Sequence, residues 1–270
     1  MWGWTFVLVK DAVTQYPTLP FLQIRFALAF AVVALIVRRW PARRELRVGA
    51  VIGAVLAAGY LAQTAGLAIT SPGNAGLITG LFVVLTPLLN RLFGTPIHWW
   101  TWVAAAGSLA GLVLLTGGPN GMNLGDLLVL ACAVLFALHI VLLGRWSPGT
   151  SSASLALVQM AMCTALFSLG GTWSLRPPSG AVWLAIVVTA LFASAFGYFI
   201  QTWAQAHISA NRTALVLATE PAWALVAAVA LAGQRFGFAQ AIGAALLLAA
   251  IVGHELASLK FEPHGAQPKP

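Results

Sequence analysis

Charged side chains are scarce in this sequence. Only 14 Lys and Arg residues and 6 Asp and Glu residues occur among its 270 residues, which is 7%, whereas about a quarter of the residues in an average soluble domain are charged. So few charges cannot keep the surface of a globule of this length in water. The composition therefore excludes a soluble enzyme, a disordered protein and an ordinary nucleic-acid binder. The hydrophobic share of 60% indicates a polytopic membrane protein instead.

Cysteines and recognisable chemical motifs are also rare. The two cysteines, Cys132 and Cys163, both lie inside apolar runs, so the sequence predicts no disulfide framework. It contains no phosphate-binding loop, no cluster with metal-ligand spacing and no nucleophile with its base. We therefore expect no cofactor, no metal site and no enzymatic activity. The net charge of +8 comes from basic residues scattered between apolar runs, so it predicts membrane topology rather than a binding site for polyanions.

Proline, glycine and charged residues divide the chain into ten apolar segments. A helix needs about 20 apolar residues to cross the hydrocarbon core, and nine of the segments are long enough. Continuous apolar runs are typical of helices, whereas barrel strands would alternate over about 10 residues. The fold class is therefore all-α with about ten transmembrane helices. The predicted segments are 2–13, 19–37, 46–69, 74–93, 99–116, 124–143, 152–173, 181–203, 213–232 and 238–256.

The distribution of Lys and Arg between the connections predicts the orientation. If the N-terminus is cytoplasmic, ten basic residues lie in the inner connections and only Lys10, Arg176 and Arg235 lie in the outer ones. Because cytoplasmic connections carry the excess of positive charge, we expect a multi-pass protein of the cell membrane (plasma or inner membrane) with both termini cytoplasmic. The polar residues 258–270 are expected to form a disordered cytoplasmic tail.

An internal repeat relates the two halves of the chain. The sequence GYLAQT at 59–64 recurs as GYFIQT at 197–202, an offset of 138 residues, which is five helices. Because five is odd, the second copy enters the membrane from the opposite side, as in the inverted repeats of secondary transporters. The predicted repeats are residues 1–117 and 123–257, called here the first and second halves. The first helix is short compared with its counterpart, so we expect it to be truncated, either natively or because the true start precedes Met1.

Several motifs resemble the drug/metabolite transporter superfamily, specifically its EamA-type members with ten helices. They are the opening WGWTFVLVKDAV, Pro20-Phe21 before Arg25-Phe26, TSPGNAGLITGLFVVLTPLL at 70–89, Gly125-Asp126, Glu220-Pro221 and Gly243-Ala244. The chain departs from that family at Gly233-Gln234, where Gly-Glu is usual, and in its short first helix. The resemblance implies two five-helix repeats and the export or exchange of small metabolites, with no particular substrate.

Glu220 is the only carboxylate predicted well inside a helix. Burying a charge in the bilayer costs about 2.5–3.5 kcal/mol on insertion scales, so such groups normally face a cavity or a partner. Pro221 follows it and removes a backbone donor, which loosens the helix locally. We expect Glu220 to bind a cationic group or to carry a proton. The alternative is a salt bridge that only fixes helix packing.

Two pairs of polar residues share helix faces three positions apart: Tyr60 with Gln63, and Tyr198 with Gln201. Inverted symmetry predicts that these pairs face each other near the midplane, where phenols and amides can bind a solute without the cost of a charge. Simple hydrogen bonding between packed helices is the alternative, worth about 0.6 kcal/mol each.

Weaker candidates surround these pairs. Asn74, Trp203 and Trp4 are added to the substrate site because they are near the predicted faces. Arg25 and His139 also lie inside helices. We interpret Arg25 as structural because the matching residue of the second half is neutral, and His139 as a satisfied polar group.

These observations favour a secondary transporter of a small metabolite or drug-like solute that works by alternating access, as an exporter or exchanger. Its expected partners are that solute, possible coupling protons and the lipid bilayer, with no nucleic acid. A channel or facilitator is the alternative, although no ring of selectivity residues is visible. An intramembrane enzyme is a second and weaker alternative. The sequence leaves the substrate, the coupling ion, the direction of transport and the oligomeric state open.

Overall fold

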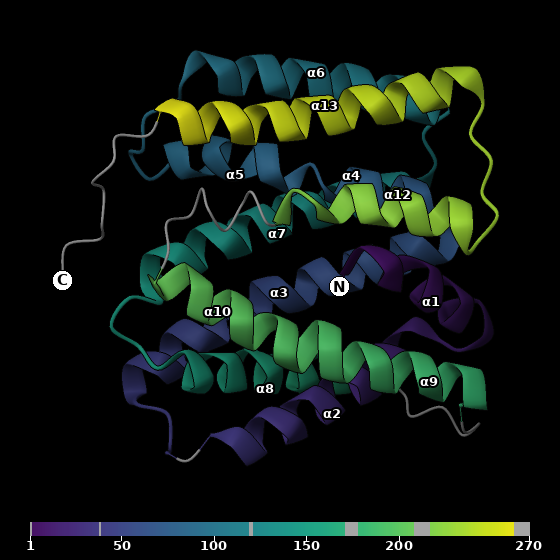
Figure 1. Ribbon diagram of the computed structural model, residues 1–270. Coiled ribbons are helices and arrows are strands. Elements are labelled where there is room, and N and C mark those ends of the chain that lie inside the picture. The colour runs from purple at the N-terminus through teal and green to yellow at the C-terminus, as the bar shows by residue number, and fades with distance from the viewer. Residues whose placement is uncertain (1, 38, 119–120, 171–177, 208–216, 262–270) are drawn as a thin grey trace.

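The structure, a computed structural model, describes residues 2–37, 39–118, 121–170, 178–207 and 217–261. Every regular element within these ranges is helical, which confirms the predicted fold class, and the helices lie side by side in one bundle (Figure 1). They are α1 (Trp2–Gln15), α2 (Thr18–Ile36), α3 (Arg43–Ile69), α4 (Pro72–Thr79), α5 (Phe82–Arg91), α6 (Trp99–Thr116), α7 (Leu124–Trp146), α8 (Ser152–Gly170), α9 (Gly180–Val188), the π-helix η1 (Thr189–Phe196), α10 (Gly197–His207), α12 (Glu220–Ala230) and α13 (Phe238–Phe261).

Eight of the helical spans are long and apolar enough to cross a membrane, counting α4 with α5 and α9 with η1 and α10. The other two predicted spans correspond to α1 and α12. At 14 residues, α1 is about 21 Å long, less than the hydrocarbon thickness of about 30 Å. The predicted spans 152–173 and 213–232 extend beyond the described residues.

Two predicted helices depart from a regular α-helix, which the hydropathy did not reveal. The span predicted as 74–93 is broken into α4 and α5 at Gly80 and Leu81. There Leu81, Val83 and Val84 donate to carbonyls three residues back, at 3.1 Å each, as in a tighter 3₁₀ turn. Another helix packs closely at the break, because a Cβ atom on Gly80 would lie 2.7 Å from the Pro221 ring. The span predicted as 181–203 is continuous but contains η1.

The predicted start of the disordered tail is also too early in the sequence. The disordered segment was expected from residue 258, whereas α13 continues to Phe261. No proline or glycine lies between residues 254 and 261, so nothing in the sequence ends the helix at 256. The rest of the tail, 262–270, lies outside the described residues.

Capping interactions fix the ends of two long helices. The Glu45 side chain accepts hydrogen bonds from the backbone N–H of Ala42 and of Ser151, both at 2.8 Å, and forms an ion pair with Arg39. At the opposite end of the bundle, Asp126 caps α7 and accepts a hydrogen bond from the Thr70 hydroxyl at the end of α3. These bonds tie α3 to the ends of α8 and α7, and they give Asp126 the capping role expected of an acid at a helix start.

Contacts between the halves are reciprocal. A Cβ on Gly59 would lie 2.6 Å from the ring of Phe136 in α7, and one on Gly197 would lie 2.9 Å from the ring of Trp2 in α1. Gly59 and Gly197 are repeat counterparts at the offset of 138 residues. Trp2 and Phe136 correspond in the looser alignment of the first two helices of each half, where the offset is 134 residues and Arg25 is matched with Gln159. Exchanging the halves therefore exchanges one contact for the other, which is what a twofold relation between them would produce.

Candidate functional site

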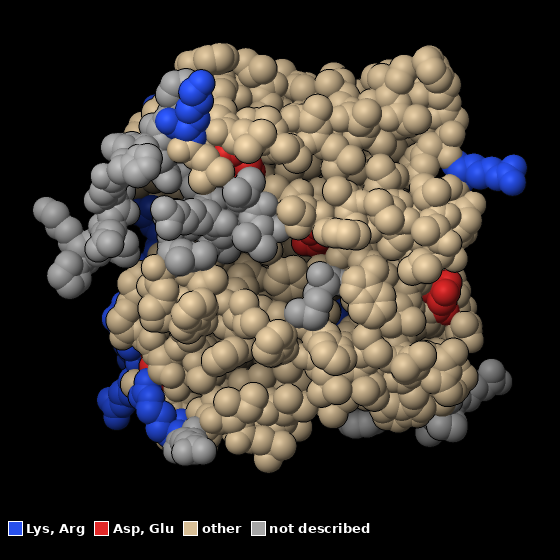
Figure 2. All heavy atoms as spheres, in the orientation of Figure 1, with Lys and Arg blue, Asp and Glu red and all other residues tan. Residues whose placement is uncertain are grey.

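A cavity opens in the middle of the bundle, between helices of both halves. It opens to the surface, and the space between its walls, with open solvent at the mouth included, is about 590 Å³. Figure 2 shows the surface hollowed near the centre of one face, with acidic atoms visible at the hollow. The lining residues are Trp2, Thr5, Phe6, Val9, Arg25, Tyr60, Gln63, Leu67 and Phe82 from the first half, and Phe136, His139, Ile140, Tyr198, Gln201, Leu217 and Glu220 from the second.

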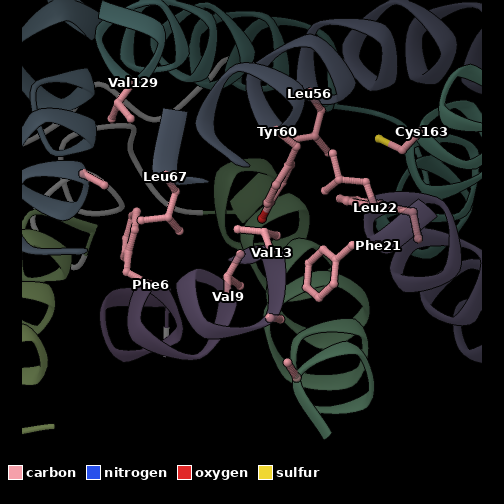
Figure 3. Close-up of a cluster of buried hydrophobic side chains, with 14 of the residues drawn as sticks. Phe6, Val9, Val13, Phe21, Leu22, Leu56, Tyr60, Leu67, Val129 and Cys163 are labelled. Carbon is pink, nitrogen blue, oxygen red and sulfur yellow. The ribbon is translucent and has the colours of Figure 1, made fainter. Parts of the chain in front are cut away.

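Tyr60 and Tyr198 meet across the boundary between the halves. Their hydroxyl groups are hydrogen-bonded at 3.1 Å, and the two residues are separated by 138 positions, the repeat offset. Both are buried, and their rings lie edge to face. Figure 3 shows Tyr60 extending from α3 toward the helix that carries Val9 and Val13. The repeated tyrosines therefore pair directly at the centre of the molecule.

The break between α4 and α5 and the turn before α12 reach the cavity at corresponding points. The break at Gly80 and Leu81 in the first half corresponds, at the same offset, to a turn at residues 218–219 in the second half. The first residues after each interruption, Phe82 and Glu220, are repeat counterparts, and both line the cavity. Paired interruptions of this kind are typical of solute sites in transporters, because broken helices free backbone groups and helix ends at the midplane.

Glu220 begins α12 and lies in its first turn, where the positive end of the helix dipole favours a negative charge. It is partly exposed and lines the cavity. Its backbone carbonyl is packed so closely against α1 that a Cβ on Gly3 would lie 2.6 Å from it. Within the described ranges the ion pairs are Arg39–Glu45 and His254–Glu255, so Glu220 has no basic partner there.

The two predicted glutamines line the cavity but do not meet. The Gln63 amide donates to the Thr79 hydroxyl at 3.3 Å, just before the break between α4 and α5. The Gln201 amide donates to Gln205 at 3.2 Å, and Gln205 donates in turn to the carbonyl of Ile140 in α7. Each glutamine is thus held by its own neighbours with its side chain at the cavity wall.

Three of the eight predicted site residues lie elsewhere. Trp4 is 42% exposed and Trp203 is 49% exposed, so both face outward from their helices, and Trp203 stacks on His207. Asn74 lies in the first turn of α4, where its backbone N–H donates to the Ser71 hydroxyl, away from the cavity lining. The other five, Glu220 and the two Tyr–Gln pairs, are brought together around one space.

Two residues interpreted as structural from the sequence also line that space. Arg25 donates from Nε to the Ser194 hydroxyl at 2.9 Å and from an Nη atom to the Tyr60 hydroxyl at 3.3 Å. His139 bonds through Nε2 to the Gln159 side chain at 2.8 Å. The helical spacing that groups Tyr60 with Gln63 could not predict either residue, because Arg25 and His139 belong to other helices. The signal available in the sequence was their position inside apolar segments.

Comparison with known proteins gives consistent results. The EamA-like transporter family matches residues 1–117 and 123–254. An uncharacterized transporter of Archaeoglobus fulgidus is 28% identical over 261 residues, which cover 93% of this chain and 81% of that protein. The uncharacterized inner membrane transporter YedA of Escherichia coli strain K12 is 27% identical over 205 residues, 72% of this chain and 67% of the relative.

A solved crystal structure supports the arrangement of the helices. It superposes with a TM-score of 0.67 over 96% of this chain and 96% of that chain, at 19% sequence identity. At that identity the likeness concerns the fold alone.

Proposed function

Because the chain belongs to the EamA-like transporter family, it is a membrane transporter, and we propose that it is a secondary transporter that carries a small organic solute through the central cavity. The observation that carries this proposal is the cavity itself, which polar side chains of both halves line around the bonded pair Tyr60 and Tyr198. Glu220 binds a cationic group of the solute or carries the coupling proton, and the Tyr and Gln side chains orient the solute.

The two halves act as inverted repeats in this proposal. The reciprocal contacts of Gly59 and Gly197, the paired helix interruptions and the two ranges matched by the family support that relation. Alternating access then follows from rocking of one group of helices against the other about the cavity, which opens it to each side in turn. The excess of basic residues in the connections supports cytoplasmic termini.

Purified protein in proteoliposomes tests the proposal. Vesicles loaded with a small-molecule extract of the source cells should exchange internal for external labelled solutes in a saturable way, and the recovered solutes should be chemically unaltered. Flux that rises without saturation would indicate a channel, and altered products would indicate an enzyme.

The role of Glu220 has a sharper test. Glu220→Gln keeps the size of the side chain and its hydrogen bonds but removes the charge, so exchange should fall at least about tenfold if the carboxylate binds the solute. If the carboxylate only carries the proton, flux driven by a pH gradient should be lost while solute exchange persists. Asp11→Asn is the matched control, because Asp11 is an exposed acid at the end of α1. Wild-type flux in both assays for Glu220→Gln would contradict both roles.

A further inference from the structure

Arg25 is a buried cation that has no carboxylate partner among the residues that the structure describes. Its side chain is 3% exposed, yet it reaches the cavity from α2. Neither ion pair found among the described residues includes it. Its contacts there are with neutral groups: the hydroxyls of Ser194 and Tyr60, and the faces of the Tyr60 and Phe26 rings, 4.7 and 5.4 Å from the guanidinium carbon. A buried charge in a membrane normally has an opposite charge beside it.

Arg25 is held in place but not saturated with acceptors. A guanidinium group has five N–H donors, and the structure gives acceptors in the described part of the chain for only two of them. The Ser194 acceptor belongs to the π-helix η1, which directly precedes the helix that carries Tyr198. π-Helical turns are frequent at functional sites. The remaining donors are available to a group that enters the cavity.

The tyrosine pair adds one more donor. The Tyr60 hydroxyl accepts a bond from Arg25 and shares one bond with the Tyr198 hydroxyl. Two phenols that share a single bond use only one of their two protons between them. Whichever tyrosine donates, the other proton is free to bind an acceptor in the cavity. Arg25 and the tyrosines thus form a cluster of donors that matches a carboxylate.

We infer that the transported solute is a small zwitterion, whose anionic group, such as a carboxylate, binds at Arg25 and the tyrosine pair while its cationic group binds at Glu220. The inference rests on the proposed function. It follows from the charges at the cavity wall, one basic and one acidic side chain that do not pair with each other. An amine alone would leave Arg25 uncompensated, and an anion alone would add a negative charge beside the carboxylate of Glu220. A zwitterion compensates both.

Three matched sets of labelled probes test this inference in proteoliposomes: a mixture of α-amino acids, the corresponding decarboxylated amines, and the corresponding N-acetylated acids. We expect the wild type to exchange members of the amino-acid mixture and to exchange the amines and the N-acetylated acids at least about tenfold less well. Arg25→Gln should exchange amino acids at least about tenfold less well than the wild type. The ratio of amino-acid exchange to amine exchange should also fall, because the variant loses only the group that binds the carboxylate. Arg145→Gln removes one positive charge from an exposed helix end and should behave as the wild type.

Folding is monitored separately, by thermal unfolding of each variant. If Arg25→Gln does not fold, Arg25→Lys keeps the charge but loses the fork of donors, and its apparent KM for amino acids should rise at least about tenfold with little change in the maximal rate. Wild-type amino-acid kinetics in either folded variant would overturn the inference. The inference would also be overturned if the wild-type protein exchanged only the amines, only the N-acetylated acids, or extract solutes but none of the three probe sets. Each of these results would still agree with the proposed transporter function. No exchange of any solute, extract included, would contradict the proposed function itself.

Discussion

The contact between α6 and α13 gives the most quantitative prediction. A Cβ atom on Gly243 would lie 2.4 Å from the backbone nitrogen of Leu115 and 2.7 Å from the carbonyl oxygen of Gly111. These are backbone atoms of a regular helix, so no side-chain rotation can relieve the overlap. Ordinary contact begins at 3.4 Å, so Gly243→Ala must move the two helices apart by about 1 Å, and overpacking of this kind costs about 1–3 kcal/mol.

The same helix offers a matched control. Gly253 lies on α13 with nothing within 4 Å of an added Cβ. Replacing a glycine by alanine within a helix gains about 1 kcal/mol from backbone propensity, and this gain is the same in Gly243→Ala and Gly253→Ala. The difference in stability between the two variants therefore isolates the steric cost, and we expect Gly243→Ala to be less stable than Gly253→Ala by about 1–3 kcal/mol.

The two cysteines supply the assay. Cys132 and Cys163 are both fully buried, so a dye that fluoresces on reaction with thiols reports unfolding as the protein is heated in detergent. We expect the unfolding temperature to fall for Gly243→Ala and to stay constant or rise for Gly253→Ala. Equal unfolding temperatures would refute the close approach of α6 and α13 at Gly243.

Two further predictions concern single side chains. Gln234, from the second half, caps the start of α4 in the first half: its side chain accepts a bond from the Gly73 N–H at 2.9 Å and donates to the Ser71 hydroxyl. Gln234→Ala should therefore lower the free energy of unfolding by about 1–2 kcal/mol. Gln234→Glu should lower it by less, since a carboxylate still accepts the Gly73 bond. Equal losses in the same dye assay would argue against the cap. Cysteines introduced singly at Gln63 and Gln201 should react with small polar thiol reagents, and solute should slow the reaction; inertness at both positions would contradict an accessible cavity there.

The scaffold was readable from the sequence because it depends on short-range patterns. The lengths of the apolar runs and the positions of Pro, Gly and charged residues located those span ends that the structure describes within five residues. The repeated GYxxQT motif predicted that the helices carrying it would face each other. Its most direct consequence, the bond between Tyr60 and Tyr198, is present in the structure. The break at Gly80 was not predicted. At the break, Gly80 packs against Pro221, which is more than a hundred residues away in the sequence, and no local sequence pattern predicts such a contact.

The site was predictable only in part because proximity in sequence is not proximity in space. Trp203 was proposed for its closeness to Gln201, yet two positions along a helix turn a side chain by about 200°, and Trp203 faces outward. Trp4 is exposed in the same way, while Trp2, two positions earlier, lines the cavity and donates to the carbonyl of Ala193 at 2.7 Å. For both tryptophans, helical periodicity was the better guide than closeness to a motif.

The case of Arg25 shows why a repeat predicts a scaffold better than a binding site. Arg25 was interpreted as structural because its counterpart, Gln159, is neutral, but Gln159 is fully buried and occupied with His139 and Thr202, whereas Arg25 reaches the cavity. Glu220 differs from its own counterpart, Phe82, in the same manner. The first half thus supplies the basic side chain of the cavity and the second half the acidic one, although each helix has a matching partner. Two equal halves would suit a symmetric solute. In the transporter proposed above, the difference between these side chains would let the cavity distinguish one end of a solute from the other.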